Sequence, residues 1–297
     1  MRVANYEYSE QIGQGAFGTV FKGRNVNTGE LVVVKTEPYR VKFSSLKHES
    51  TILNLLYSKS CRNVPPTYWY GINEITQHRV FVMPHYSETL EAILQKSIAS
   101  ESTVPLQNGT IHIMRNVMRS AVLILKSVHD NYVVHRDIKP ANWMIHRNEL
   151  ILIDFGLATF YVDSNEKHIE RPLQAKTHII GSPKYASWNI HCGEEYSRRD
   201  DLMSLIYIGL RCFGGSLFES SCSNRFEDVG PNTELAHPRN QWFKNQKTLE
   251  AVLLKSASWP ELAKFAEMVY ALSFQERPDY NDLSELFCRK NDINTLH

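Results

Sequence analysis

The stretch IGQGAFGTV constrains the fold more than any other short feature of the chain. Its glycines, Gly13, Gly15 and Gly18, have the spacing G-x-G-x-x-G, which is a weak signal when it stands alone. In a Rossmann fold the third glycine opens a helix, but here it is followed by TVFKG, which favours a β-strand. The stretch therefore predicts a β-hairpin whose backbone N–H groups can approach phosphates closely. It excludes a Rossmann-type oxidoreductase, because no βαβ unit surrounds the glycines.

The character of the chain changes from strand-rich to helix-rich near residues 84–88. Apolar and β-branched residues around the turn NTGE predict strands before this point. After it, apolar residues recur at helical spacing, most clearly from Ile111 to Val128. The predicted elements are strands in TVFKGRNV and LVVVKTE, a helix in SLKHESTILNLLYSK, short strands at 67–71 and 79–83, the long helix at 111–128, strands in WMIH and LILID, and helices in DDLMSLIYIGLRCF, PELAKFAEMVYALSF and YNDLSELFCRK.

Composition limits the class of protein. The chain has 297 residues, 42% of them hydrophobic, and a net charge of +1, which allows a sizeable core and argues against a generic polyanion binder. Its five cysteines are scattered and favour a reducing compartment. The N-terminus has no signal-peptide core, and no apolar stretch is long enough to span a bilayer. We expect a soluble intracellular monomer, in the cytoplasm or nucleus, with no nucleic-acid or membrane partner.

Two charged residues in the first part of the chain are ambiguous when each is taken alone. Lys35 lies in the apolar strand VVVK, where a lysine either points to solvent at a sheet edge or serves a phosphate. Glu49 lies in the middle of the following predicted helix. Together they would supply a cation for phosphates and the carboxylate that fixes it.

The segment HRDIKPANWMIHRNELILIDFG resolves the ambiguity. Asp137 can accept the proton of an attacking hydroxyl, and Lys139 can neutralise charge on a transferred phosphoryl group. Asn142 and Asp154 offer the hard oxygen atoms that Mg²⁺ requires. The ordered set of glycine-rich hairpin, strand lysine, helix glutamate, H-R-D-x-x-x-x-N and D-F-G does not arise by chance.

At these residues the chain resembles the eukaryotic protein kinases. The resemblance implies an α+β, bilobal fold, with a small antiparallel β-sheet lobe plus one helix, a larger mainly α-helical lobe, and ATP in the cleft. It covers a kinase domain at 6–290. The small lobe is expected at about 1–84, the hinge at 84–88 and the large lobe at 89–290, with a short C-terminal end at 291–297.

The resemblance also implies roles for individual residues. Asp137 would be the catalytic base, and Ser182 would brace it together with Lys139, as in serine/threonine rather than tyrosine kinases. Asn142 and Asp154 would bind Mg²⁺. The ATP-binding residues would be Ile12, Gly13, Gly15, Gly18, Val20, Val33, Lys35, Glu49, Met83, Pro84 and Tyr86, with the Pro84 carbonyl accepting from adenine and the Tyr86 N–H donating to it.

A longer match narrows the family. The chain has no A-P-E motif, and GSPKYASWNIHCGEEYSRRDDLMSL resembles the casein kinase 1 family instead. HESTIL, TLEAIL and ERPDY are also similar to that family. In its pattern Asp201 begins the central helix, so we expect it to be buried and bonded to catalytic-loop amides. Arg198 and Arg199 are then expected to pair locally or to support the activation segment.

Some positions depart from the family pattern. Lys184 stands where the family has an arginine, and therefore lacks the bidentate fork. In GSLFESSCSNRFED the usual Pro, Trp and Gly are missing, so a substrate anion site would depend on Lys184 and Arg225. Selection of acidic or phosphate-primed protein substrates is expected to be altered. The chain ends soon after the last helix, so autoinhibition by a tail is not expected.

Two functions remain open at this level. The first is an active serine/threonine protein kinase that uses ATP and Mg²⁺. The second is a pseudokinase scaffold that binds nucleotide without phosphotransfer. Scaffolds often lose the base, a metal ligand or the strand lysine, and all three are present here. This favours the active kinase.

Overall fold

The computed structural model describes residues 1–15, 18–100, 108–170, 179–213 and 259–288. These residues fall into two compact units. Met1–Glu88 and Trp143–Ala158 make up the first unit, and the remaining described residues make up the second. The chain therefore returns to the first unit for sixteen residues after it has entered the second. No described helix combines the length and the apolar character that crossing a bilayer requires.

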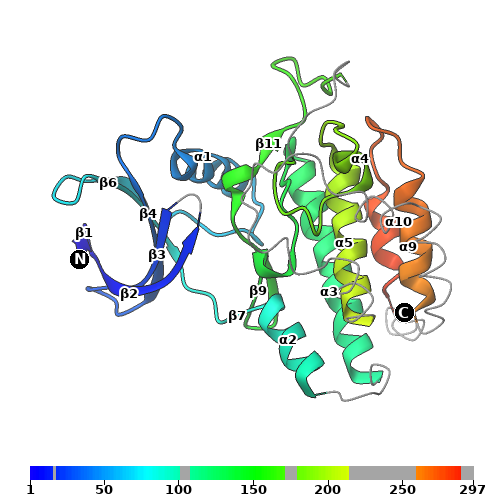
Figure 1. Ribbon diagram of the computed structural model, residues 1–297, viewed down its shortest axis with the longest axis horizontal. Helices are drawn as coiled ribbons and strands as arrows, with labels where there is room; N and C mark the ends of the chain where they lie inside the picture. The colour runs from blue at the N-terminus through cyan, green and yellow to red at the C-terminus, as the bar shows by residue number, and fades with distance from the viewer. Residues whose placement is uncertain (16–17, 101–107, 171–178, 214–258, 289–297) are drawn as a thin grey trace. The chain divides into compact units, whose positions relative to one another are not determined.

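The first unit contains a six-stranded sheet in which every neighbouring pair is antiparallel (Figure 1). Gly13 pairs with Val20 and Gly15 with Gly18, so the predicted glycine hairpin is confirmed. The strand order is β1-β2-β3-β4-β6-β5, and the strands are β1 (Arg2–Val3), β2 (Tyr6–Gly15), β3 (Gly18–Asn25), β4 (Leu31–Pro38), β5 (Trp69–Asn73) and β6 (His78–Pro84).

The two faces of β4 have different tasks, because successive side chains of a strand point to opposite faces. Val32 and Val34 are fully buried and form a core with apolar residues of β1, β2 and β6. Val33, Lys35 and Glu37 therefore project from the other face. This alternation places the strand lysine on the face that the valine core does not use.

Helix α1 (Ser45–Ser58) contacts β4 and β6 and buries Ile52, Leu53 and Leu56. It also contacts the short 3₁₀ helix η2 (Phe155–Leu157), which follows the antiparallel hairpin of β9 (Trp143–His146) and β10 (Glu149–Leu152). The Nε2 atom of the His48 ring lies 2.7 Å from the carbonyl oxygen of Ala158. Helix α1 is therefore held by two parts of the chain, the strands β4 and β6 and the segment that contains η2 and Ala158.

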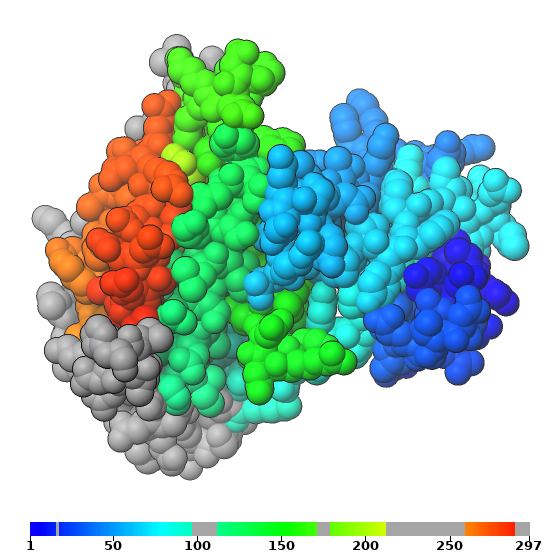
Figure 2. All heavy atoms as spheres, turned by 180° about the vertical axis from the view of Figure 1, so that it is seen from behind, coloured from blue at the N-terminus to red at the C-terminus, as the bar shows by residue number. Residues whose placement is uncertain are grey.

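The second unit is mainly helical. Helix α5 is its centre, since every residue from Arg198 to Arg211 is buried, and it contacts α3 and α9. Helix α10 packs on α3, and Figure 2 shows α10 (red) beside α3 (blue-green). The helices are α2 (Leu90–Ser100), α3 (Asn108–His129), α4 (Trp188–His191), α5 (Arg198–Phe213), α9 (Pro260–Tyr270) and α10 (Tyr280–Glu285), with 3₁₀ helix η1 (Pro140–Asn142) and the two-residue strands β7 (Glu88–Thr89), β8 (Val133–Val134) and β11 (Thr159–Phe160).

The structure confirms the α+β class and the elements that the sequence predicts most strongly. The helix predicted at 111–128 is α3, and its buried stripe of Met114, Met118, Ala121 and Leu125 has helical spacing. Pro260 occupies the first turn of α9, where its missing N–H costs nothing. The short strands β8 and β11 pair with each other and were not predicted.

Candidate active site

Lys35 contacts two carboxylates in the first unit. Its Nζ lies 2.8 and 2.9 Å from the two carboxylate oxygens of Glu49 and 3.1 Å from Oδ1 of Asp154. The side chains of Lys35 and Glu49 are 13% and 2% exposed, whereas that of Asp154 is 39% exposed. The solvent-edge interpretation of Lys35 is therefore wrong, and the lysine is held inside the unit.

The charges of this cluster depend on one another. Burial works against the charged form of Lys35, but the carboxylates of Asp154 and Glu49 outweigh it and raise the pKa of the ammonium. Burial raises the pKa of Glu49, while Lys35 acts in the opposite direction. Lys35 thus stays protonated although its side chain is largely buried.

Asp154 has an unusual backbone. Its φ of 68° and ψ of 67° lie in the left-handed region, which is uncommon for residues other than glycine. Such conformations concentrate at functional sites. This backbone turns the chain from β10 into η2 and leaves the Asp154 carboxylate both in contact with Lys35 and partly exposed. A carboxylate in that position can serve as a hard oxygen ligand.

The glycines of the hairpin differ in what they are needed for. Gly18 has a φ of 135°, and a Cβ atom there would lie 2.0 Å from the carbonyl oxygen of Thr36, so the fold itself requires glycine. A Cβ atom at Gly15 would meet nothing within 4 Å. The fold therefore has no need of a glycine at position 15. Open space beside a backbone is what close approach of a phosphate requires, so Gly15 fits a nucleotide site.

The residues predicted to contact adenine lie at the end of strand β6 and directly after it. Met83 is buried in β6, opposite Val33 in the register with β4. Pro84 is the last residue of that strand, and Tyr86 lies half-buried beside the ring of His146, with 5.6 Å between ring centroids. All the predicted ATP-binding residues belong to the first unit, and Ile12, at 48% exposure, is among its exposed apolar side chains.

The second unit brings together Asp137, Lys139 and Ser182. Lys139 Nζ lies 2.7 Å from Asp137 Oδ2 and 3.0 Å from Ser182 Oγ. The backbone N–H of Ser182 donates to Asp137 Oδ1 at 2.9 Å. Asn142 Nδ2 donates to the Asp137 carbonyl at 2.9 Å and to its carboxylate at 3.2 Å. These contacts use the Asn142 amide nitrogen, so its oxygen is the atom left for a cation.

Helix α5 holds the loop that carries Asp137 through the side chain of Asp201. Asp201 is 1% exposed and accepts hydrogen bonds from the backbone N–H groups of His135, at 2.7 Å, and Arg136, at 3.0 Å. The expectation that Asp201 is buried and bonded to catalytic-loop amides is confirmed. Gly181 completes the arrangement, since a Cβ atom there would lie 2.2 Å from the Arg136 carbonyl oxygen.

Of the two arginines before Asp200 and Asp201, Arg199 pairs locally, as expected, whereas Arg198 contacts residues distant in the sequence. Arg199 donates to Glu194 at 2.6 Å. Arg198 donates to the Gln275 carbonyl at 2.6 Å and stacks on the ring of Tyr161, with 4.6 Å between Cζ and the ring centroid. Both side chains are therefore part of the structure of the second unit.

Sequence reasoning missed a further buried arginine, Arg211, which contacts Tyr185, the residue after Lys184. Arg211 of α5 donates to both carboxylate oxygens of Glu91 in α2, one of them at 2.6 Å, and to the Tyr185 hydroxyl at 3.0 Å. Lys184 also acts electrostatically on Glu91. No local pattern could link Arg211 to Glu91 across 120 positions. Arg225, the other predicted anion contact, lies outside the described residues.

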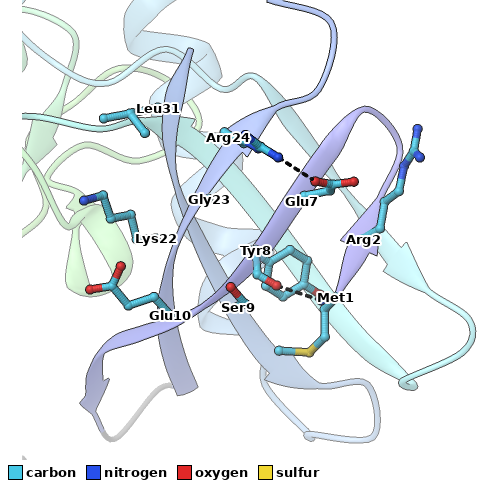
Figure 3. A pocket seen from close by; sticks show the side chains of 10 residues that line it. All are labelled: Met1, Arg2, Glu7, Tyr8, Ser9, Glu10, Lys22, Gly23, Arg24 and Leu31. Atoms are coloured by element: carbon cyan, nitrogen blue, oxygen red, sulfur yellow. Dashed lines mark hydrogen bonds and ion pairs between the residues drawn. The ribbon is translucent and has the colours of Figure 1, made fainter. Parts of the chain in front are cut away.

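The first unit also has hollows, and few of the residues that line them belong to the predicted site. One, of about 660 Å³, has a polar lining that includes Glu7, Lys22 and Arg24, with the Arg24–Glu7 ion pair across it (Figure 3). None of its lining residues was predicted to bind a ligand. Another, of about 420 Å³, borders Gly15 and Gly18 and extends to Glu37 and Ser45 at the start of α1.

Comparison with known proteins places the chain in a family. The protein kinase domain family matches residues 6–284, so the chain belongs to the protein kinases. Within them it is similar to casein kinase I homolog 2 and casein kinase I homolog 1 of Schizosaccharomyces pombe, which confirms the predicted resemblance to casein kinase 1. The identity is 29% to each, over 293 and 298 residues that cover 95% and 96% of this chain and 62% and 60% of those proteins. The chain thus spans about three-fifths of the length of these relatives.

Proposed function

We propose that the protein is an active serine/threonine protein kinase of casein kinase 1 type. It transfers the γ-phosphoryl group of ATP to serine or threonine hydroxyls of protein substrates and uses Mg²⁺. The observation that carries the proposal is the contact of Lys139 with both Asp137, at 2.7 Å, and Ser182, at 3.0 Å. A base, a cation and a hydroxyl in mutual contact form a polar centre of the kind that phosphoryl transfer needs.

The residues present fit ATP and Mg²⁺. When bound, ATP supplies the phosphoryl group and the metal ion neutralises its charge. Lys35 would hold the α- and β-phosphates, and Gly15 would leave room for them. Asp154 and Asn142 would bind the metal ion through oxygen atoms, since the Asp154 carboxylate is partly exposed and the Asn142 nitrogen is already engaged.

Asp137 would act as the base. Its carboxylate accepts from three groups in the second unit, Lys139, Asn142 and the Ser182 N–H, and these contacts would fix its orientation for a substrate hydroxyl. Lys139 would share its charge between Asp137 and the transferred phosphoryl group. Ser182 would keep Lys139 in place through its hydroxyl oxygen.

The scaffold alternative is disfavoured by the intact contacts. A protein that only binds nucleotide has no need of an ordered Asp137–Lys139–Ser182 set in addition to the Lys35–Glu49 pair. We propose that the kinase works inside the cell as a monomer, without nucleic-acid or membrane partners, in line with its near-neutral charge and scattered cysteines.

The substrate preference we propose is a weakened form of acidic or primed recognition. Lys184 supplies positive charge, and the neighbouring Arg211 is already engaged by Glu91 and Tyr185. Because Lys184 stands where the family pattern has a basic residue, a negatively charged substrate residue would contact Lys184, with Arg225 as a second contact.

The test is phosphotransfer from ATP·Mg²⁺ to an acidic protein substrate. Asp137→Asn and Lys35→Met should each lower the rate by at least about 100-fold. Lys126→Met is a matched control, because Lys126, near the end of α3, forms an ion pair with Asp130, which follows that helix. It should leave the rate unchanged. Equal label incorporation in the parent, Asp137→Asn and Lys35→Met would refute an activity at this site. A parent that binds nucleotide without transferring phosphate would favour the scaffold.

A further inference from the structure

Glu37 is a buried carboxylate that the catalytic assignments leave unused. It is 3% exposed and lies on β4 two residues after Lys35, on the same face of the strand. Its register partner on β6 is Arg79, with Nη1 3.6 Å from Oε1. An opposite-charge pair directly across two strands stabilises both. The pair alone does not explain the other contacts of Glu37.

Those contacts are all with the start of α1. Glu37 accepts hydrogen bonds from the hydroxyl of Ser44, from the hydroxyl of Ser45 at 3.2 Å and from the backbone N–H of Leu46 at 3.4 Å. Ser44 is itself the N-cap, and its Oγ accepts from the N–H of Lys47 at 3.0 Å. Glu37 therefore fixes the capping side chain as well as the first turn.

Helix α1 has no acidic residue in its own first turn. A negative charge there is favourable, because the unpaired N–H groups of a helix start carry partial positive charge. Glu37 supplies that charge from a neighbouring strand. The start of α1 is consequently tied to β4, and not only capped by its own residues.

The second tie between the same two elements is Lys35 with Glu49. On β4 the two anchors are two residues apart, about 6.6 Å. On α1, Ser45 and Glu49 are four residues apart, about 6 Å along the axis. Because these two spacings agree, the contacts of Glu37 with the start of α1 and the contact of Lys35 with Glu49 form at the same time. The Glu37 contacts therefore limit where along β4 the Lys35–Glu49 contact can form.

We propose that Glu37 is a positioning residue for phosphotransfer, which fixes the start of α1 on β4 so that Glu49, about one turn later, reaches Lys35. This inference rests on the proposed kinase function. Loss of the Glu37 charge lets α1 shift, and Lys35 then retains Asp154 but loses the two contacts from Glu49. The residue acts through Glu49 and touches no reacting group.

The test compares Glu37→Gln with Glu7→Gln in the full chain. Glu7 is a matched control, because it also faces an arginine across two strands, Arg24 at 3.5 Å (Figure 3), but among the described residues it makes no hydrogen bond or ion pair with α1. Two readouts are taken: kcat/KM for ATP, and the rate at which an amine-reactive reagent labels Lys35 in the absence of nucleotide. Glu37→Gln should lower kcat/KM for ATP about ten-fold and raise the rate of Lys35 labelling several-fold. Glu7→Gln should change neither by more than about two-fold.

A double-mutant cycle separates positioning from general support of the fold. In a Glu49→Gln background, Glu37→Gln should lower kcat/KM by less than about two-fold, because the contact that it serves is already gone. An equal loss in both backgrounds would overturn the inference. So would a Glu37→Gln variant that matches Glu7→Gln in both readouts while the parent is active.

A second variant and the labelling readout keep the inference testable if Glu37→Gln does not fold or the parent is inactive. If Glu37→Gln does not fold, the double substitution Ser44→Ala with Ser45→Ala leaves the Glu37–Arg79 pair intact and should shift both readouts in the same direction. An absence of any shift there would count against the inference. If the parent shows no phosphotransfer, the proposed function fails, and the labelling of Lys35 still decides whether Glu37 positions Glu49.

Discussion

Asp201, in the first turn of α5, accepts a 3.0 Å hydrogen bond from the backbone N–H of Arg136, which has a left-handed φ of 67°. A non-glycine residue in this region is strained by about 1–3 kcal/mol. The same carboxylate accepts from the His135 N–H and from the ring of His129, and these bonds lower its pKa against the opposing effect of burial. The strained loop before Asp137 is therefore held in place by a residue on the most buried helix.

Asp201→Asn should destabilise the protein. An amide retains one acceptor oxygen but turns an N–H group toward donors that Asp201 now satisfies, which leaves buried groups unpaired. The free energy of unfolding should fall by about 3 kcal/mol in urea titrations. Asp282→Asn, at an exposed position of α10, should change it by less than about 0.5 kcal/mol. A loss no larger than that of Asp282→Asn would contradict the role assigned to Asp201.

Gly15→Ala and Gly18→Ala should fail in different ways. At Gly18 a methyl group collides with the Thr36 carbonyl, so unfolding should become easier by more than about 2 kcal/mol. At Gly15 the methyl group enters open space, so stability should hold while ATP binding weakens. Thermal unfolding and nucleotide titration measure the two effects. Unchanged ATP affinity in Gly15→Ala would separate this glycine from the phosphates.

Ser182→Ala should slow the chemical step and leave ATP affinity alone. The substitution removes the oxygen that accepts from Lys139 and preserves the backbone N–H that donates to Asp137. We expect kcat to fall about ten-fold with little change in the KM for ATP. Ser58→Ala, which removes an exposed hydroxyl at the end of α1, should leave both constants unchanged. A rise in the KM for ATP alone would point to a different role.

The Glu91–Arg211 pair should give a specific pH dependence. Burial works to raise the pKa of Glu91, but the hydrogen bonds and charge of Arg211 prevail and hold it below its ordinary value. The charged form therefore stabilises the folded state above about pH 4.3, the unfolded value. The contribution is lost as pH falls through the lower, folded value.

Glu91→Gln should accordingly cost about 1–2 kcal/mol of unfolding free energy at pH 7. The difference from the parent should stay constant between pH 8 and pH 6, and shrink only below about pH 4. Urea titrations at each pH measure it. Glu267→Gln, in an exposed pair with Lys264, should show almost no difference at any pH. A difference that grows on acidification would have the wrong sign.

Lys184→Ala tests the substrate preference. Pre-phosphorylated peptides should lose more kcat/KM than their unprimed counterparts, because the phosphate loses its main cation. Lys167→Ala serves as control, because Lys167 is an exposed lysine that lies 4.0 Å from Glu170. Equal losses for both kinds of peptide would remove Lys184 from substrate recognition.

Features with a local pattern could be predicted from the sequence. The glycine hairpin, α3 and α5 all follow from periodicity or from a turn that only glycine allows. Asp201 was placed through family resemblance, and its buried position and amide contacts agree. Two-residue strands such as β8 and β11 have no period to detect.

Features that depend on distant contacts could not be predicted. The pairing of Lys35 with Glu49 was expected, but no local signal indicates the contact of Lys35 with Asp154 across 119 positions. Glu37 resembles any charged residue at a strand end, and nothing local indicates that it caps the next helix. The return of Trp143–Ala158 to the first unit is likewise a property of tertiary packing and not of composition.

Lys35, Glu49 and Asp154 together carry one positive and two negative charges, so the cluster has an excess negative charge of one. Under the proposed function, such a cluster alone repels the phosphates of a nucleotide. A divalent cation reverses the sign and makes it attractive. Nucleotide and metal ion should therefore strengthen each other's binding by the same factor, as thermodynamic linkage requires. If the proposed function holds, one buried lysine flanked by two carboxylates should make nucleotide affinity depend on free Mg²⁺.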